Sequence, residues 1–268
     1  MPSLIVSVAL NFAVIAGCFW FYRRCAAERM RAQDSERQLA GELLVAGRQL
    51  DALAYALAQE LRVPLRAVAG FAQVLESEYA ERLDREGFRM LARVRAGADR
   101  AVLLMDDLLR LTEAGRRPLK QEHVDMTALA QEAAEEFIDA YPRSLVDIRV
   151  MPHAWGDPAL MKTIWVQLIG NALKFSAQAT APRVYIGARE ERGGIQYWVR
   201  DNGIGFDPSQ REKLFGVFQR LHRQEEYPGS GIGLAIVQLI VTRHGGRMDA
   251  VGKPGGGAEI RFLLSENP

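Results

Sequence analysis

The 268-residue sequence predicts an α+β protein with an N-terminal transmembrane helix, a helical hairpin and a C-terminal α/β sandwich. Three observations predict this fold class. An apolar run occupies residues 4–22, two amphipathic stretches extend to about residue 117, and helical and strand-like segments then alternate to the C-terminus. We therefore expect four parts: a membrane anchor (1–22), a helical linker (23–51), a dimerisation hairpin (52–117) and an α/β domain (118–268).

The apolar run from Leu4 to Tyr22 is long enough to cross a membrane as a helix, because about 20 residues span the roughly 30 Å hydrocarbon core. Arg23 and Arg24 follow the run at once, so the positive-inside bias places the remainder in the cytoplasm. A cleaved signal peptide is the alternative, but its basic leading region is missing. We expect a single-pass protein of the inner (cytoplasmic) membrane.

Composition and charge limit the classes of partner. With 49% apolar and 25% charged residues, the chain is suited to folded domains rather than to disorder. The formal net charge of +1 offers no concentrated basic character, so we expect no nucleic-acid partner. Cys18 and Cys25 have neither the spacing of a disulfide framework nor that of metal ligands.

The two amphipathic stretches each repeat apolar residues at steps of three or four, which marks one buried stripe per helix. The first stripe comprises Leu53, Leu57, Leu61, Leu65, Val68, Ala72 and Leu75. The second comprises Phe88, Leu91, Val94, Ala98, Val102, Met105 and Leu109, before Gly115 and Pro118 end the run. Two such helices cannot enclose a core alone, so the hairpin predicts a four-helix bundle formed by dimerisation.

Beyond Pro118 the pattern favours a sandwich of helices on a mixed sheet. The expected helices are Met126–Asp139, Pro158–Phe175 and Ile232–His244. The expected strands are Asp147–Val150, Arg183–Glu191, Ile195–Asp201, Arg247–Val251 and Ala258–Leu264, with a short segment at Glu122–Asp125 before the first helix.

Four motifs with chemical potential lie in this second half: Asn171–Ser176, Asp201–Phe206, Leu214–Phe218 and Gly229–Leu234. One Gly-x-Gly alone can be a plain turn. Together and in this order, the four motifs resemble the catalytic domain of sensor histidine kinases. That domain belongs to a wider ATPase superfamily that includes gyrase, a heat-shock chaperone and mismatch-repair proteins. The resemblance covers nearly all of Leu119 to Leu264 and implies that the domain binds Mg-ATP.

The resemblance assigns roles to four residues, and three of them have a plainer alternative. Asp201 would accept a hydrogen bond from the adenine amino group, or simply cap a strand end. Gly203 and Gly205 would let the backbone approach the base, or serve as turn glycines. Asn171 would offer a neutral oxygen to Mg²⁺.

Further residues would meet the phosphates. Lys174 lies on the same helix face as Asn171, three residues on, and could contact phosphate oxygens; a solvated lysine is the alternative. Gly229, Gly231 and Gly233 precede a helix and would form a mobile lid over phosphates near its N-terminus.

The stem completes the resemblance, with one departure. The segment Ala58–Leu65 aligns with the family's Ser-His-Glu-Leu-Arg-Thr-Pro-Leu box, but Gln59 occupies the histidine position. A glutamine amide lacks the basic lone pair of imidazole, so we expect no phosphoryl linkage there. Glu60, the family's general base, would be vestigial, and Val63 replaces a polar residue that orients water in dephosphorylating members.

The sequence therefore predicts a degenerate sensor histidine kinase that binds Mg-ATP and cannot phosphorylate itself. It would act as a homodimer, or as a heterodimer with another histidine kinase, and possible partners include a response regulator. A non-enzymatic scaffold that sequesters a signalling partner is one alternative. An independent ATPase is another, although Gln167 occupies a position where hydrolysing relatives usually have a water-activating Glu.

Overall fold

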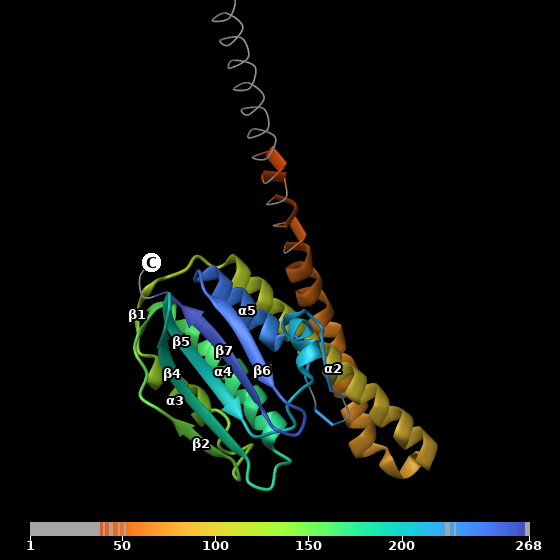
Figure 1. Ribbon diagram of the computed structural model, residues 1–268. Coiled ribbons are helices and arrows are strands. Elements are labelled where there is room, and N and C mark those ends of the chain that lie inside the picture. The colour runs from red at the N-terminus through yellow and green to blue at the C-terminus, as the bar shows by residue number, and fades with distance from the viewer. Residues whose placement is uncertain are drawn as a thin grey trace, which may run out of the picture. The chain divides into compact units, whose positions relative to one another are not determined.

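The computed structural model describes residues 38–39, 41–42, 45–47, 49–50, 52–222, 226–227 and 229–265 (Figure 1). Residues Ala54–Pro268 form one compact unit. The predicted membrane anchor, 1–22, lies outside the described residues. Among the helices that are described, none is both long and apolar enough to cross a bilayer.

The stem is a helical hairpin, as its two apolar stripes predict. Its first helix covers residues 52–78, a short 3-10 helix η1 (Ala80–Arg82) follows, and α2 (Arg85–Arg116) returns. Asp84 caps α2 by accepting a hydrogen bond from the Gly87 amide at 2.7 Å. Ion pairs join the two helices: Arg95 with Glu76 at 2.5 Å, and Arg62 with Asp106 at 2.7 Å, the latter without hydrogen-bond geometry.

Most of the stem's predicted apolar stripe is exposed in the single chain. Ala72, Ala98 and Leu109 are buried, but the larger side chains lie open to solvent, among them Leu53, Leu57, Leu61, Val68, Leu75, Phe88 and Val94. An exposed apolar stripe of this kind on a helix is typical of an interaction face. The four-helix bundle therefore stays a prediction for the dimer.

The C-terminal part is built on a five-stranded mixed sheet in the order β2-β4-β5-β7-β6 (Figure 1). The strands are β2 (Leu145–Ile148), β4 (Arg183–Glu191), β5 (Gly194–Asp201), β6 (Arg247–Gly252) and β7 (Ala258–Leu264). The pair β2 and β4 is parallel and the other neighbours are antiparallel. A separate antiparallel pair joins β1 (Glu122–Val124) to β3 (Ala154–Gly156).

Three helices, α3 (Met126–Glu135), α4 (Pro158–Ser176) and α5 (Gly233–Arg243), complete a two-layer sandwich. In Figure 1, α4 and α5 lie behind the sheet. Trp165 of α4 packs edge-on against Tyr197 and Phe262 of the sheet, with ring centroids 6.2 and 5.4 Å apart. All three side chains are fully buried and form the centre of the core.

The predicted elements differ from the structure at a few boundaries. The expected strand Asp147–Val150 lies two residues earlier because the register with β4 pairs Leu145 to Ile148, and Val150 is left exposed. The first expected helix ends at Glu135 rather than Asp139, where the exposed Ile138 shows that the buried face has ended. The short β3 and the 3-10 helix η2 (Pro208–Phe215) were not predicted.

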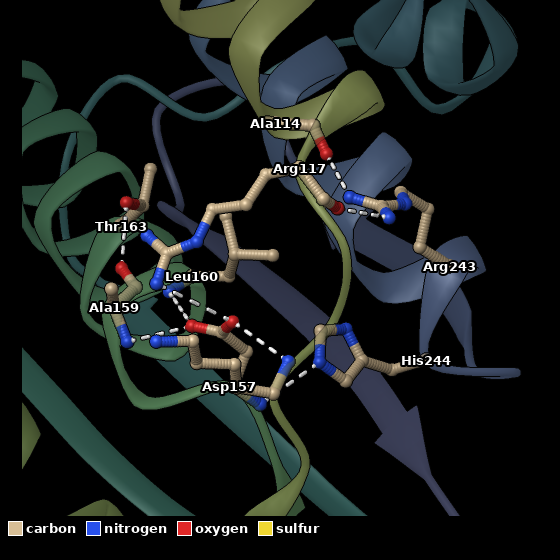
Figure 2. A network of polar contacts seen from close by, with 9 residues as sticks. Ala114, Arg117, Asp157, Ala159, Leu160, Thr163, Arg243 and His244 are labelled. Carbon is tan, nitrogen blue, oxygen red and sulfur yellow. Dashed lines mark hydrogen bonds and ion pairs between the residues drawn. The ribbon is translucent and has the colours of Figure 1, made fainter.

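A polar network fixes the junction between the stem and the sheet domain (Figure 2). Asp157 is fully buried and caps α4 by accepting hydrogen bonds from the amides of Ala159 and Leu160 at 3.1 and 3.3 Å. It also accepts one from the Lys120 amide at 3.1 Å, and the Arg117 guanidinium lies 3.8 Å away. Burial raises the pKa of Asp157, but these hydrogen bonds and the Arg117 charge outweigh it, so the pKa is lowered overall.

The end of α5 forms the other half of this network. Arg243 donates hydrogen bonds to the carbonyls of Ala114 and Arg117, the last of which lies 2.6 Å away (Figure 2). His244 accepts from the Asp157 amide through Nε2 at 3.1 Å and contacts the Ile240 carbonyl through Nδ1 at 2.7 Å. Because the amide can only donate, Nδ1 carries the ring proton. The C-terminal turn of α2 is thereby attached to α4 and α5.

Candidate functional site

Seven of the predicted site residues line one cavity of about 230 Å³: Asn171, Lys174, Asp201, Gly205, Gly229, Gly231 and Gly233. It lies between α4, the end of β5 and the segment before α5. Gly203 is next to the cavity but does not line it. Apolar side chains complete the walls, including Leu168, Val199, Phe206 and Ile260. The structure thus brings together residues from motifs that are far apart in the sequence.

Asp201 ends β5 and is only 8% exposed. Its Oδ1 accepts hydrogen bonds from the amides of Gly203 at 2.8 Å and Ala258 at 3.3 Å. Burial is the largest effect on this carboxyl and raises its pKa, although both hydrogen bonds act in the opposite direction. The described residues give Oδ2 no hydrogen bond, so this oxygen is left as an acceptor for a ligand N–H.

The structure shows why the two positions after Asp201, Gly203 and Gly205, require glycine. A Cβ on Gly203 would lie 2.3 Å from the Phe175 carbonyl oxygen of α4. Gly205 has φ +62°, and its Cβ would lie 1.9 Å from the Lys253 carbonyl oxygen. Gly205 thus has a positive φ, and at both glycines the close neighbour is the protein's own backbone.

Asn171 and Lys174 lie one turn apart on α4, and Lys174 Nζ donates a hydrogen bond to Asn171 Oδ1 at 3.1 Å. Burial, and to a smaller extent the charge of Arg220, lower the pKa of Lys174 to about 8, against the opposing effect of Asp107. The protonated form of the amine is therefore less stable than that of an exposed lysine. A phosphate group beside the amine would stabilise the protonated form.

The glycine-rich segment before α5 closes one side of the cavity. Gly229 and Gly231 have φ +155° and +78°, values that L side chains rarely adopt. Arg220 donates hydrogen bonds to the carbonyls of Gly229 and Tyr227 and so helps to hold this segment in place. A Cβ on Gly233 would lie 2.3 Å from Gln167 Oε1, which places Gln167 against the start of α5.

Sequence reasoning missed an aromatic cluster at the cavity. Phe175, His222 and Tyr227 have ring centroids 5.3–5.8 Å apart, and all three line the cavity. His222 Nε2 lies 3.0 Å from the Gly205 carbonyl, to which only a protonated Nε2 can donate. Phe175 lies inside the Asn171–Ser176 motif, and this position could have predicted that its ring lines the cavity.

The stem's predicted site residues are placed elsewhere. Gln59 and Glu60 are exposed on the helix over residues 52–78, and neither lines the cavity. Gln59 Nε2 donates a weak hydrogen bond to the Tyr55 hydroxyl at 3.3 Å, one turn earlier. The described arrangement therefore keeps Gln59 and Glu60 apart from the cavity.

Two family models match the chain where the stem and the sheet domain lie. The model described as His Kinase A (phospho-acceptor) domain matches residues 49–117, and the Histidine kinase-, DNA gyrase B-, and HSP90-like ATPase model matches residues 156–268. The chain belongs to the histidine kinase family. This histidine kinase homologue carries the dimerisation-type stem and the ATP-binding-type domain of two-component signalling proteins.

Relatives of this histidine kinase homologue include longer proteins. It is 30% identical to cyanobacterial phytochrome A of Nostoc over 88% of this chain and 31% of the relative, and 30% identical to the sensor protein KdpD of Escherichia coli over 90% and 26%. The chain spans about a third or less of these relatives. A solved structure, full-length ShkA in complex with AMPPNP, matches 80% of this chain and 46% of that one with TM-score 0.58 and 27% identity.

Proposed function

We propose that this chain is a membrane-anchored histidine kinase homologue that binds Mg-ATP but cannot phosphorylate itself. One contrast carries the proposal: the residues suited to a nucleotide gather in one cavity, whereas Gln59 occupies the position of the phosphoacceptor histidine. Membrane anchoring rests on the apolar run of residues 4–22 alone.

The cavity residues fit a magnesium nucleotide. Asp201 offers a buried acceptor to an adenine amino group beside apolar walls. Lys174 offers a cation to phosphate oxygens, and Asn171 Oδ1, now occupied by the Lys174 amine, is a neutral oxygen of the type that Mg²⁺ accepts. When Lys174 turns to a phosphate, Asn171 Oδ1 becomes available to the metal.

Self-phosphorylation needs a nucleophile that this stem lacks. In the reaction of the family, an imidazole nitrogen forms a bond to the γ-phosphorus while the bond to the departing ADP oxygen breaks. The nitrogen of Gln59 shares its lone pair with the carbonyl and cannot do this. Glu60 is then a base with no proton to remove, and Val63, 73% exposed, presents an isopropyl group where water would need a polar anchor.

The partner in this proposal is another histidine kinase. The exposed apolar stripe of the stem is suited to pairing with a similar hairpin, either from a second copy or from a complete kinase. In a heterodimer, the ATP-binding domain would phosphorylate the partner's histidine or hold it idle, and the signal would pass to a response regulator.

Calorimetry of the full chain in detergent tests nucleotide binding. Wild-type protein should bind Mg-ATP, and Asp201→Ala should lose most of that binding because the adenine acceptor is removed. Asp147→Ala, an exposed aspartate of β2, is the matched control and should bind normally. If wild type fails to bind Mg-ATP, or if Asp201→Ala binds as well as wild type, the assignment of the pocket is wrong.

Labelling with ATP radioactive at the γ-phosphate tests the missing phosphoacceptor. Wild type alone should gain no stable phosphate, whereas Gln59→His should become labelled if the ATP-binding domain can reach the stem, with Gln59→Ala as the control. Stable label on the wild-type chain would contradict the proposal. Steady release of free phosphate would instead support an independent ATPase.

A further inference from the structure

The aromatic cluster at the cavity has no part in the nucleotide contacts proposed above. Phe175 comes from the last turn of α4, whereas His222 and Tyr227 come from the segment between η2 and α5. Tyr227 is only 5% exposed, and its ring packs against Phe175 with ring centroids 5.3 Å apart. The cluster therefore joins α4 to the segment that precedes α5, at the wall of the cavity.

Tyr227 is held by its backbone, its hydroxyl and its ring. Its carbonyl accepts a hydrogen bond from Arg220 at 2.6 Å, and its hydroxyl donates one to Gln178 Oε1 at 3.3 Å. His222 packs against the rings of both Phe175 and Tyr227, with ring centroids 5.6 and 5.8 Å away. Phe175 thus has two packed aromatic neighbours, and together they restrict the movement of its ring.

The amine of Lys174 lies over the ring of Phe175. Its Nζ is 4.5 Å from the ring centroid, which is the distance of a cation–π contact. The same Nζ donates a hydrogen bond to Asn171 Oδ1 at 3.1 Å, and a Cβ on Gly229 would lie 3.3 Å from it. A cation–π contact attracts the charge of the ammonium as a whole, so it leaves the N–H groups available to phosphate oxygens.

We propose that Tyr227 is a positioning residue for phosphate binding: it fixes the ring of Phe175, and that ring holds the Lys174 amine beside the glycine-rich segment. Tyr227 acts through Phe175 and makes no phosphate contact of its own. This inference rests on the proposed Mg-ATP binding and adds to it how the phosphate-binding cation is placed. A ligand with phosphates therefore depends on Tyr227, whereas adenosine, which has none, does not.

Binding of Mg-ATP and of adenosine to Tyr227→Leu tests this role in the full chain in detergent. Loss of the aromatic ring should weaken Mg-ATP binding roughly fivefold or more, a normal effect for one desolvated cation–π contact, and should leave adenosine binding unchanged. Tyr227→Phe keeps the ring and loses only the hydroxyl, so it should restore the affinity for Mg-ATP.

Tyr141→Leu is the matched control, because Tyr141 is a half-buried tyrosine that pairs with Phe137 and does not line the cavity. It should bind both ligands normally. An equal loss of Mg-ATP and adenosine binding in Tyr227→Leu would make the ring part of the base site and overturn the inference. Unchanged Mg-ATP binding in that variant would overturn it as well.

A second measurement needs no nucleotide and separates this inference from the proposed function. An aromatic ring shifts the NMR signals of protons over its face upfield, so lysine labelled with ¹³C at Cε reports the ring contact of Lys174. Its signal, assigned with Lys174→Arg, should lie upfield of the other lysines in wild type and in Tyr227→Phe. It should move toward them in Tyr227→Leu and in Phe175→Leu.

Lys162, on α4 but not at this cavity, should keep its signal in every variant and so reports that the helix is intact. A wild-type Lys174 signal without the upfield shift would show that the ring does not hold the amine. The same shift in Tyr227→Leu as in wild type would show that Tyr227 does not fix the ring. Either result overturns the inference, whether or not the chain binds ATP.

Discussion

At the scale of single residues, we expect the partly buried amine of Lys174 to make the proposed nucleotide binding depend on pH. Its pKa without ligand is about 8, lowered by burial and by Arg220, and a bound phosphate would raise it. Binding therefore selects the protonated form. Affinity is full below pH 8 and declines as the pH rises above it, because a proton must then be taken up.

Calorimetry at pH 9 in buffers of different ionisation enthalpy measures this proton uptake. Wild type should take up part of a proton when it binds Mg-ATP at pH 9 and almost none at pH 6.5. Lys174→Met should bind more weakly and show no uptake at either pH. Equal uptake in the variant would assign the proton to another group.

At Gly205, a side chain would be destabilising for two reasons: the positive φ and the close approach of another part of the backbone. Gly205→Ala should unfold more easily than Gly255→Ala in urea. Both positions have nearly the same positive φ, +62° and +70°, which costs an L residue about 1–2 kcal/mol. Only at Gly205 would the added Cβ also meet backbone, the Lys253 carbonyl oxygen, whereas Gly255 has open space. Equal losses in the two variants would show that the loop moves aside freely.

At the scale of elements, the aspartates that cap α3 and α4 differ in the further hydrogen bonds that they accept. Asp125 and Asp157 cap α3 and α4, each by accepting from two amides. Asp125 is exposed, but Asp157 is fully buried and also accepts a hydrogen bond from the Lys120 amide, between α2 and β1. The cap of α4 therefore serves the junction with the stem as well as its own helix.

The two caps give a matched pair of substitutions. Asp125→Ala should lower the free energy of unfolding by about 1 kcal/mol, a normal value for a lost cap. Asp157→Ala should lower it by about 2 kcal/mol or more, since it also removes the acceptor of the part-buried hydrogen bond from the Lys120 amide. Urea unfolding followed by circular dichroism measures both, and equal losses would mean that water replaces the junction contacts.

At the scale of the whole molecule, the exposed stripe on the stem predicts the oligomeric state. Light scattering of the full chain in detergent should give the mass of a dimer. Leu61→Glu, at a stem position 47% exposed, should shift the protein to monomer because two such charges cannot enter a bundle core. Val150→Glu, at a position 91% exposed on the sheet domain, should remain dimeric.

A monomeric wild type would remove the basis for a four-helix bundle and with it the simplest route to a heterodimer. Dissociation of Val150→Glu as well as Leu61→Glu would instead place the contact outside the stem. The comparison thus distinguishes a stem-mediated dimer from association through any exposed apolar side chain.

The sequence by itself determined the elements and the candidate site of this protein. Helical periodicity located both stem helices, α4 and α5, and alternation located most strands, because these patterns depend on local geometry with periods of 3.6 and 2. The motifs named Asn171, Lys174, Asp201 and the lid glycines, and the structure brings them to one cavity. Their roles toward a nucleotide stay predictions.

Only the tertiary structure decided which distant groups meet. It placed Asp107 of the stem at the pocket, Arg243 against the end of α2, and the backbone of α4 beneath Gly203. Local sequence patterns predict none of these contacts, because a charged residue on a helix face has the same spacing whether it meets solvent or another domain. The packing of the stem against the sheet domain supplies that difference.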